Sequence, residues 1–470
     1  MNEAITAGDI VTPPPLREAV RVWARLGCLS FGGPAGQIAL LHRTLVDEKR
    51  WISEERFLHG LNFCMLLPGS EAQQLATYIG WLMHGVCGGL IAGLLFILPG
   101  FLLIVTLSSL YAVFQEAAWL PALFFGVKAA VLAIVIEALL RLGRRALRER
   151  FHYYVAGASF LALFLLNLPF PLVIILAGTV GLLWMKHRQH RLAVLSRWQS
   201  SVRPRFPPLT THAIAKPLVA LVFLILVWQS PLLFVRALDA PADLIAETLS
   251  GETNVFGAVF ILFSKMAVIT FGGAYAVLSY IAQVAVGNYA WLQPGEMLDG
   301  LALAETTPGP IGLVLCFVGF LAGYRNSVAV APLAGGALGA FLAAWATFVP
   351  SFIWVFAGAP YIEKLRSNEN LSAALSAITA AVVGVILNLA LWFGVHVLFG
   401  EVGRVALLSG KTGLPIASLA WPEWRTLDVA ALAIFVSASM LLLRLKKGVL
   451  TILGVSTAAG LLIKMTEALL

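Results

Sequence analysis

Charged residues are scarce in this sequence. Only 12% of its 470 residues are Asp, Glu, Lys or Arg, whereas 60% are hydrophobic, and the mean hydropathy is +0.88. Soluble domains carry about 25% charged residues, so this composition excludes a soluble globular protein. Apolar runs of roughly 18 residues or more recur along the whole chain, which predicts an all-α polytopic membrane protein. The net charge of +8 is then assigned to cytoplasmic loops, and it does not indicate nucleic-acid binding.

Cysteine is rare as well, and no CxxC spacing relates the four residues Cys28, Cys64, Cys87 and Cys316. Scattered thiols in apolar segments predict small buried side chains, not a disulfide framework or a metal site. The apolar segments also lack an HExxH pattern, a paired aspartate motif, and a GxSxG with triad partners. We therefore expect no metal, no cofactor and no enzymatic activity. A membrane enzyme acting on lipid phosphates is kept as a remote alternative.

One stretch of the chain occurs twice. Residues 25–34 (RLGCLSFGGP) and 265–274 (KMAVITFGGA) each place a cation, a hydroxyl residue, a Phe and two glycines in an apolar run. The same offset of 240 pairs Trp51 with Trp291 and Pro68-Gly69 with Pro308-Gly309. Further along, the offset becomes 251, as in Pro99 and Pro350, so the second copy carries 11 extra residues, expected near Asn326 to Gly335. The chain is therefore predicted to contain two copies of one module, each broken at Phe-Gly-Gly.

The loop charges predict that the two modules have opposite orientations. Residues 141–150 hold five arginines and one Glu, and residues 186–205 hold six Lys or Arg and no acid, so both are expected in the cytoplasm. The loop after residue 236 is acidic, with Asp239, Asp243, Glu247 and Glu252, and is expected outside. One unpaired span between the modules then inverts the second one. Each module is predicted to hold about six helical elements, some broken or re-entrant.

These signals divide the chain into five parts. Residues 1–15 lack the basic start and apolar core of a signal peptide and predict a cytoplasmic tail. The other parts are a first module (16–185), a basic cytoplasmic linker (186–216), a connecting transmembrane span (217–236) and a second module (254–470). The cations Arg444, Lys446 and Lys447 mark the last turn as cytoplasmic, which puts the C-terminus outside.

The paired helix breaks are predicted to form the functional site. Inverted repeats with broken helices place their substrate near the midplane at the repeat interface, and backbone freed there lines a cavity. Half-helix N-termini favour an anion, although glycine pairs also fit close helix packing. The predicted binding set joins the glycine and proline breaks to nearby hydroxyls: Ser30, Gly32, Gly33, Pro68, Gly69, Ser70, Thr270, Gly272, Gly273, Thr306, Thr307, Pro308 and Gly309.

Intramembrane charges add candidates to this set. Arg25 and Lys265 are related by the 240 offset, and two cations would balance a dianion. The alternative for Arg25 is an interfacial face shared with Arg17 and Arg21. Glu71 and Glu305 are candidates for proton coupling, although Glu71 also suits a helix N-terminus and Glu305 could pair with Lys265. Weaker candidates for the cavity wall are Lys128, Gln73, Gln74 and Asn62.

Several motifs occur in register along the chain: Phe31-Gly32-Gly33-Pro34, Trp51, Leu67-Pro68-Gly69-Ser70-Glu71-Ala72-Gln73-Gln74, Tyr78-Ile79-Gly80-Trp81, Phe271-Gly272-Gly273 and Pro308-Gly309-Pro310. Together they resemble the chromate ion transporter (CHR) family. The resemblance covers both modules, as in the two-module form of the family. One departure is Ser70, where the second module has Pro310.

The resemblance implies a multi-pass protein of the bacterial inner membrane that exports chromate and confers chromate resistance. Sulfate is the close structural analogue of chromate, so a transporter of sulfate or another tetrahedral oxyanion is the alternative. A channel is a further alternative. A homo-oligomer also stays open.

Overall fold

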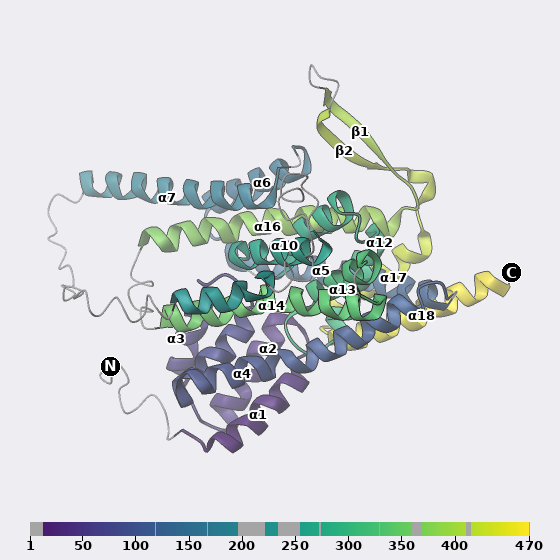
Figure 1. Ribbon diagram of the computed structural model, residues 1–470. Coiled ribbons are helices and arrows are strands. Elements are labelled where there is room, and N and C mark those ends of the chain that lie inside the picture. Colours follow the sequence, from purple (N-terminus) through teal and green to yellow (C-terminus); the bar gives the residue numbers. More distant parts are fainter. Residues whose placement is uncertain are drawn as a thin grey trace, which may run out of the picture.

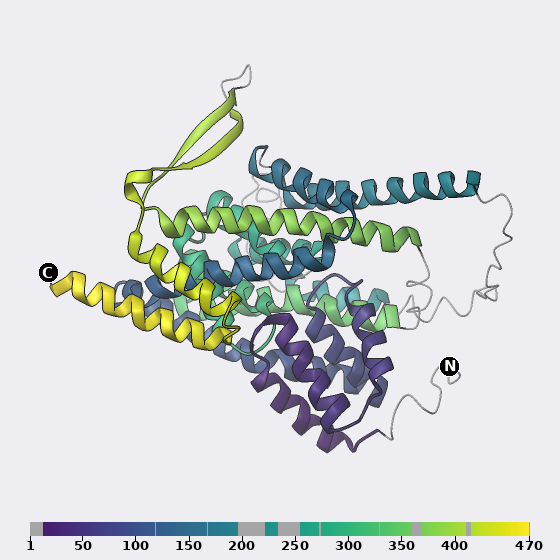
Figure 2. The same cartoon turned by 180° about the vertical axis from the view of Figure 1, so that it is seen from behind.

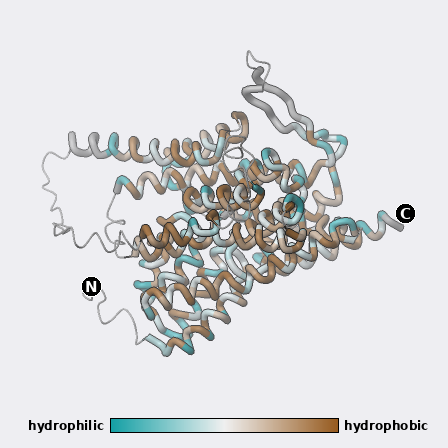
Figure 3. Tube along the Cα trace, in the orientation of Figure 1, coloured by the Kyte–Doolittle hydropathy of each residue, from teal (hydrophilic) through white to brown (hydrophobic). Residues whose placement is uncertain are grey.

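The computed structural model describes residues 13–117, 119–166, 168–195, 221–233, 254–271, 274–328, 330–359, 369–409 and 415–469. Six of the described helices are long and apolar enough to cross a membrane. Most helices lie side by side in one bundle (Figures 1 and 2). Hydrophobic residues run along nearly all of them (Figure 3). The prediction of a polytopic helical membrane protein is confirmed.

The first module begins with short helices and ends with long ones. In chain order they are α1 (Leu16–Leu29), α2 (Gly33–His42), the π-helical turn η1 (Arg43–Glu48), α3 (Glu54–Cys64), α4 (Glu71–Val113), α5 (Trp119–Ala146), α6 (Arg150–Phe164) and α7 (Phe170–Leu195). The predicted breaks fall between α1 and α2 and between α3 and α4. Pro34 lies in the first turn of α2, as expected, because proline needs no N–H partner there.

The helix labelled α4 consists of two arms. His84 and Gly85 have non-helical backbone angles, and Gly85 has a φ of 63°. The arms then pack against each other, because a Cβ on Gly80 would lie 2.5 Å from the carbonyl oxygen of Gly88. The chain therefore reverses at this point.

The second module repeats this order with a longer connection between its two arms. Its elements are α10 (Val255–Ile269), α11 (Ala274–Ala282), η2 (Gln283–Asn288), α12 (Pro294–Thr306), η3 (Ile311–Leu313), α13 (Val314–Asn326), α14 (Pro332–Gly358), α16 (Glu369–Leu398), β1 (Val402–Ser409), β2 (Pro415–Pro422), η5 (Trp424–Thr426), α17 (Val429–Leu443) and α18 (Val449–Leu469). The connection between α13 and α14 lies in the region where the sequence predicts the insertion.

Backbone details repeat between the modules. A π-helical turn in each module is followed by a non-glycine residue with positive φ, 53° at Arg50 and 50° at Ala290. The next residue, Trp51 or Trp291, donates its backbone N–H to the turn at 2.8 Å. Left-handed backbone is rare for such residues, so its occurrence at equivalent positions indicates one inherited fold.

The modules are related by an inverted, approximately two-fold arrangement. Gly143 of α5 faces Val383 of α16, and Gly394 of α16 faces Leu132 of α5. The residue numbers fall on one helix as they rise on the other, so α5 and α16 are antiparallel, and the offset of 251 exchanges the two contacts. The terminal helices are exchanged as well, because α6 and α7 pack on α16, whereas α17 and α18 pack on α5.

The segment between the modules is described only in part. A helix at Leu221–Leu233 falls inside the predicted connecting span. It packs on α14, since the indole N–H of Trp228 donates to the carbonyl of Ala346 and that of Trp345 donates to the carbonyl of Trp228, both at 3.1 Å. Residues 186–195 of the predicted linker continue α7, and residues 196–216 lie outside the described part of the chain.

The all-α prediction needs one correction. The antiparallel strands β1 and β2 form a hairpin between α16 and α17, with Val402 opposite Pro422, and it projects from the bundle (Figure 1). Proline begins and ends β2, which disfavours a helix there. The prediction missed the hairpin because it relied on long apolar runs, and these strands are short.

Candidate functional site

The helix breaks of the two modules are hydrogen-bonded to each other. The backbone N–H of Gly69 donates to the carbonyl of Thr270 at 2.8 Å, and that of Gly309 donates to the carbonyl of Ser30 at 2.9 Å. Both glycines have positive φ, 119° and 102°, which other residues rarely adopt. The repeat offset exchanges the two bonds. The breaks therefore meet at the module interface, where the sequence predicts the site. We call this meeting point, formed by Ser30, Gly69, Thr270 and Gly309, the crossing.

Two buried glutamines satisfy carbonyl groups at these breaks. The side-chain amide of Gln37 donates to the carbonyls of Ser30 and Gly309. The amide of Gln74 donates to the carbonyl of Pro68 at 2.7 Å. The position equivalent to Gln37 in the second module is Val277, so the two sides of the crossing differ in polarity.

A cavity of about 180 Å³ lies beside this crossing and receives helix N-termini from both modules. Its wall includes the first residues of α2, α4 and η3. The N-cap residues Gly32, Ser70 and Pro310 make no side-chain cap. The first N–H groups of a helix have no partner within it, and they carry the positive end of the helix dipole. The cavity therefore suits an anion.

Ionisable side chains complete the cavity wall. Arg141 and Arg145 reach it from the end of α5, and Glu71 reaches it from the first turn of α4. Arg141 is paired with Glu137 one turn away. Arg145 contacts the sulfur of Met65.

Two neutral hydroxyls also line the cavity. Tyr275 donates to the carboxylate of Glu305, which lies behind the wall. The buried hydroxyl of Thr347 has no hydrogen-bond partner in the described part of the chain. It is a free donor for a ligand.

The structure brings part of the predicted set together. Gly69, Ser70, Glu71 and Thr270 line the cavity, and Pro68, Ser30, Gly33 and Gly309 lie at or next to the crossing. The hydroxyl groups point elsewhere, because each donates its proton to a carbonyl within its own helix: Ser30, Thr270, Thr306 and Thr307. Gln73 donates to the carbonyl of Phe348, and Asn62 is exposed. Gly272 and Gly273 lie outside the described residues.

The predicted cation pair lies away from this cavity. Arg25 and Lys265 are exposed on α1 and α10, and neither belongs to the wall of this cavity or of the second cavity described below. Their role in anion binding stays a prediction. The sequence argument instead missed Arg141 and Arg145, because it used them only as markers of a cytoplasmic loop. Their spacing of four on one helix was the available signal that both lie on one face.

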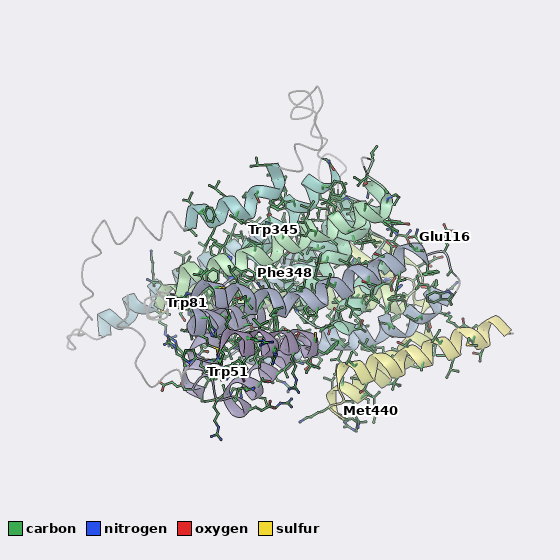
Figure 4. The ribbon with its side chains drawn as sticks, turned by 60° about the horizontal axis from the view of Figure 1, so that its bottom comes forward. Trp51, Trp81, Glu116, Trp345, Phe348 and Met440 are labelled. Atoms are coloured by element: carbon green, nitrogen blue, oxygen red, sulfur yellow. The ribbon has the colours of Figure 1, made fainter. Side chains whose placement is uncertain are left out.

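A second cavity, of about 800 Å³, lies at the opposite end of α5. Lys128 lines it and forms an ion pair with Asp299 of α12 at 3.2 Å. Figure 4 shows Glu116, on the wall of this second cavity, at one end of the bundle, and Phe348, on the wall of the first, nearer its centre. Lys128 and Ala138, on the same helix, are about 15 Å apart at the helical rise of 1.5 Å per residue.

No group of three His, Cys, Asp or Glu side chains is placed to hold a metal ion among the described residues. The first cavity offers cations, hydroxyls and backbone N–H groups, which are ligands for an anion, together with the one carboxylate of Glu71.

Comparison with known proteins shows the family of the chain. The sequence model of the family described as "Chromate transporter" matches residues 17–182 and 257–461, which are the two modules. The chain belongs to the chromate transporter family. It is similar to the "Chromate transport protein" of Pseudomonas aeruginosa, with 33% identity over 82% of this chain and 83% of the relative.

Two further relatives extend over comparable lengths. The "Probable chromate transport protein" of Synechococcus elongatus is 28% identical over 89% of this chain and 94% of its own length. The "Chromate transport protein" of Cupriavidus metallidurans is 27% identical over 82% and 84%. No solved structure matches this transporter.

Proposed function

We propose that this protein exports chromate from the cytoplasm and that the first cavity is its substrate site. The observation that carries the proposal is the meeting of three uncapped helix N-termini with Arg141 and Arg145 around one cavity at the module interface. Three positive dipole ends and the guanidinium groups of Arg141 and Arg145 attract a tetrahedral dianion. Glu137, paired with Arg141, and Glu71, on the wall, offset part of this positive charge. The names of the relatives supply chromate as the oxyanion.

The volume of the cavity is compatible with a small anion. Its 180 Å³ is roughly six times the share of one molecule in liquid water. The anion would give up hydration there, and the backbone N–H groups, the Thr347 hydroxyl and the guanidinium groups would replace it. The side chains of Ala138, Leu142 and Ile386 are among the apolar parts of the wall.

Loop charge and membrane potential support the proposed outward direction of transport. Arg141 and Arg145 belong to the basic end of α5, which the loop charges assign to the cytoplasm. Moving a dianion outward across a membrane with an inside-negative potential of about 100 mV releases about 2 × 2.3 kcal/mol. Potential alone therefore suffices for export. Export lowers the cytoplasmic chromate concentration and would give resistance.

Two separate cavities favour alternating access over an open channel. The first cavity lies at the crossing of the helix breaks and the second at the other end of α5, and they share no lining residue. A substrate would pass between them only if the crossing rearranged. Broken helices around a fixed site are typical of transporters that work in this way.

The test is flux of chromate and sulfate in proteoliposomes under imposed potential and pH gradients. We expect an outside-directed chromate flux that increases with potential, and competition by excess sulfate. If sulfate is carried and chromate is not, sulfate is the substrate and the proposal of chromate is wrong. Flux of neither would overturn the proposal.

A further inference from the structure

The second cavity contains two ion pairs that differ in how completely their cations are bound. Arg325, at the end of α13, donates to both carboxylate oxygens of Glu296 at 2.6 and 2.8 Å. It also donates to the side chain of Gln115 and to the carbonyl of Trp291. The guanidinium group of Arg325 thus makes four hydrogen bonds, which join α13 to residues next to or within α12 and to the segment after α4.

Lys128 is bound far less completely. In the described part of the chain its one ionic partner is Asp299, and the ammonium–carboxylate distance is 3.2 Å. An ammonium has three donors, so most of its capacity is unused. The side chain of Lys128 keeps 28% of its surface exposed in the cavity. Gly295 makes room for it, since a Cβ at that position would lie 3.2 Å from the ammonium nitrogen.

Asp299 is the opposite case. Its side chain is only 6% exposed. One carboxylate oxygen accepts from the Tyr111 hydroxyl at 2.8 Å, and the other faces Lys128. Asp299 belongs to the second module, whereas Tyr111 and Lys128 belong to the first, so this carboxylate crosses the module interface.

We propose that Lys128 is the cation of a second oxyanion site, on the exit side of the transporter, and that Asp299 occupies it while no anion is bound. An oxyanion that reaches the second cavity would take the place of the carboxylate at Lys128, with Arg325 fixing the wall behind it. The inference rests on the proposed function, because it assigns this cavity to the same export route. Competition from Asp299 keeps the site weak, so an anion can leave.

The inverted repeat indicates that the pair of Lys128 and Asp299 acts only at the second cavity. The positions equivalent to Lys128 and Asp299 are Thr379 and His59. The charged pair is therefore absent from the equivalent positions at the other end. A site that receives substrate from one direction is needed once.

The test separates an anion site from a structural ion pair by the direction of the effect. Binding of radiolabelled chromate and flux of chromate and sulfate are measured on the full-length protein for Asp299→Asn, Lys128→Gln and the double variant. Asp299→Asn frees Lys128 but can still accept from Tyr111, so we expect chromate to bind about tenfold more tightly and to be released more slowly. The double variant, Lys128→Gln with Asp299→Asn, lacks both charges, so no charge is left buried and unpaired. It should fold and should carry chromate about tenfold more slowly than the parent protein.

The exposed pair formed by Lys49 and Glu18 at 2.8 Å gives the matched control, Lys49→Gln with Glu18→Gln. That variant should behave as the parent. If Asp299→Asn does not tighten binding and the folded double variant carries chromate at the parent rate, Lys128 and Asp299 form only a structural pair. A parent protein that carries neither oxyanion would overturn the proposed function, and this inference with it.

Discussion

The amide nitrogen of Gly69 lies 2.8 Å from the carbonyl oxygen of Thr270, and this bond joins the helix break of one module to that of the other. The pseudo-symmetric bond from Gly309 to Ser30 closes the second break in the same way. At each break, one backbone N–H group is bound by a carbonyl of the other module. In lipid, an unsatisfied backbone group costs several kcal/mol. The crossing therefore couples the stability of the modules to the shape of the first cavity beside it.

Substituting Gly69 should destabilise this crossing. A Cβ there would lie 2.6 Å from the Ser351 hydroxyl, and a φ of 119° is disfavoured for alanine. We expect Gly69→Ala to cost about 1–3 kcal/mol, seen as a lower melting temperature in nanodiscs. Gly257→Ala is the matched control, because a Cβ on that helical glycine would have no neighbouring atom within 4 Å and alanine is the better helix former. Equal melting temperatures for the two variants would contradict the strain argument.

Neutralising Arg141 or Arg145 should weaken chromate transport. A hydrogen bond to a charged group contributes about 1.5–3 kcal/mol, and partial exposure reduces this, so we expect about a tenfold loss for each. Arg141→Lys should retain more activity than Arg141→Gln, since it keeps the charge and loses only the fork of donors. Arg144 is exposed on the same helix and does not line the cavity, so Arg144→Gln is the control for altered loop charge. Equal flux in the Arg141→Gln and Arg144→Gln variants would show that Arg141 does not bind the anion.

The exposed cations test the site predicted from the repeat. Arg25→Gln and Lys265→Gln should reduce chromate flux less than Arg141→Gln, because neither side chain lines the cavity. Initial rates at matched expression give the comparison. A larger loss at both Arg25 and Lys265 would move the site toward the paired cations.

Glu71 is the better placed of the two proton candidates. It lines the cavity, where its negative charge would repel a bound dianion, so the anion and a proton should enter together. We expect Glu71→Gln to abolish the dependence of flux on a pH gradient and to leave flux driven by potential measurable. Glu305→Gln should have a smaller effect, since Tyr275 separates that carboxylate from the cavity. Unchanged pH dependence in both variants would leave these residues with structural roles.

Orientation can be tested at the two ends of α5. Cysteines are placed at Glu116 and Arg144 after replacement of the exposed Cys28 and Cys87. In intact cells an impermeant thiol reagent should label the cysteine at position 116 and not the one at 144, because the basic end of α5 is assigned to the cytoplasm. The reverse pattern would invert the topology and make the first cavity open outward.

The repeat, the helix breaks and the helical membrane fold could be predicted because they depend on local signals. Glycine at positive φ, proline in a first helical turn and long apolar runs each determine structure over a few residues. The cavity wall could not be predicted in this way. Arg141 and Arg145 reach it only because α5 packs beside the helix breaks, which is a relation between segments far apart in the sequence.

Arg25 shows why the repeat in the sequence did not identify the residues that line the first cavity. Its neighbours Trp23 and Leu26 are buried against the first module, so the helix turns Arg25 outward together with Arg17 and Arg21. Lys265 lies likewise between the buried Phe263 and Met266. The repeat placed the two cations at equivalent positions, but the packing of their helices decided which way they face.

The crossed bonds at Gly69 and Gly309 have a consequence for shorter chains built from one such module. A lone copy would have to pair with a second copy inserted upside down, because each break needs the carbonyl of an inverted partner. Two identical copies obey the same loop charges and would normally enter the membrane the same way round. A gene for a single module would therefore have to encode loops with almost no charge bias, or be accompanied by a sister gene of opposite bias. When two copies are fused through a single connecting transmembrane span, the second copy is inverted by the connection, so neither weak charge bias nor a sister gene is needed.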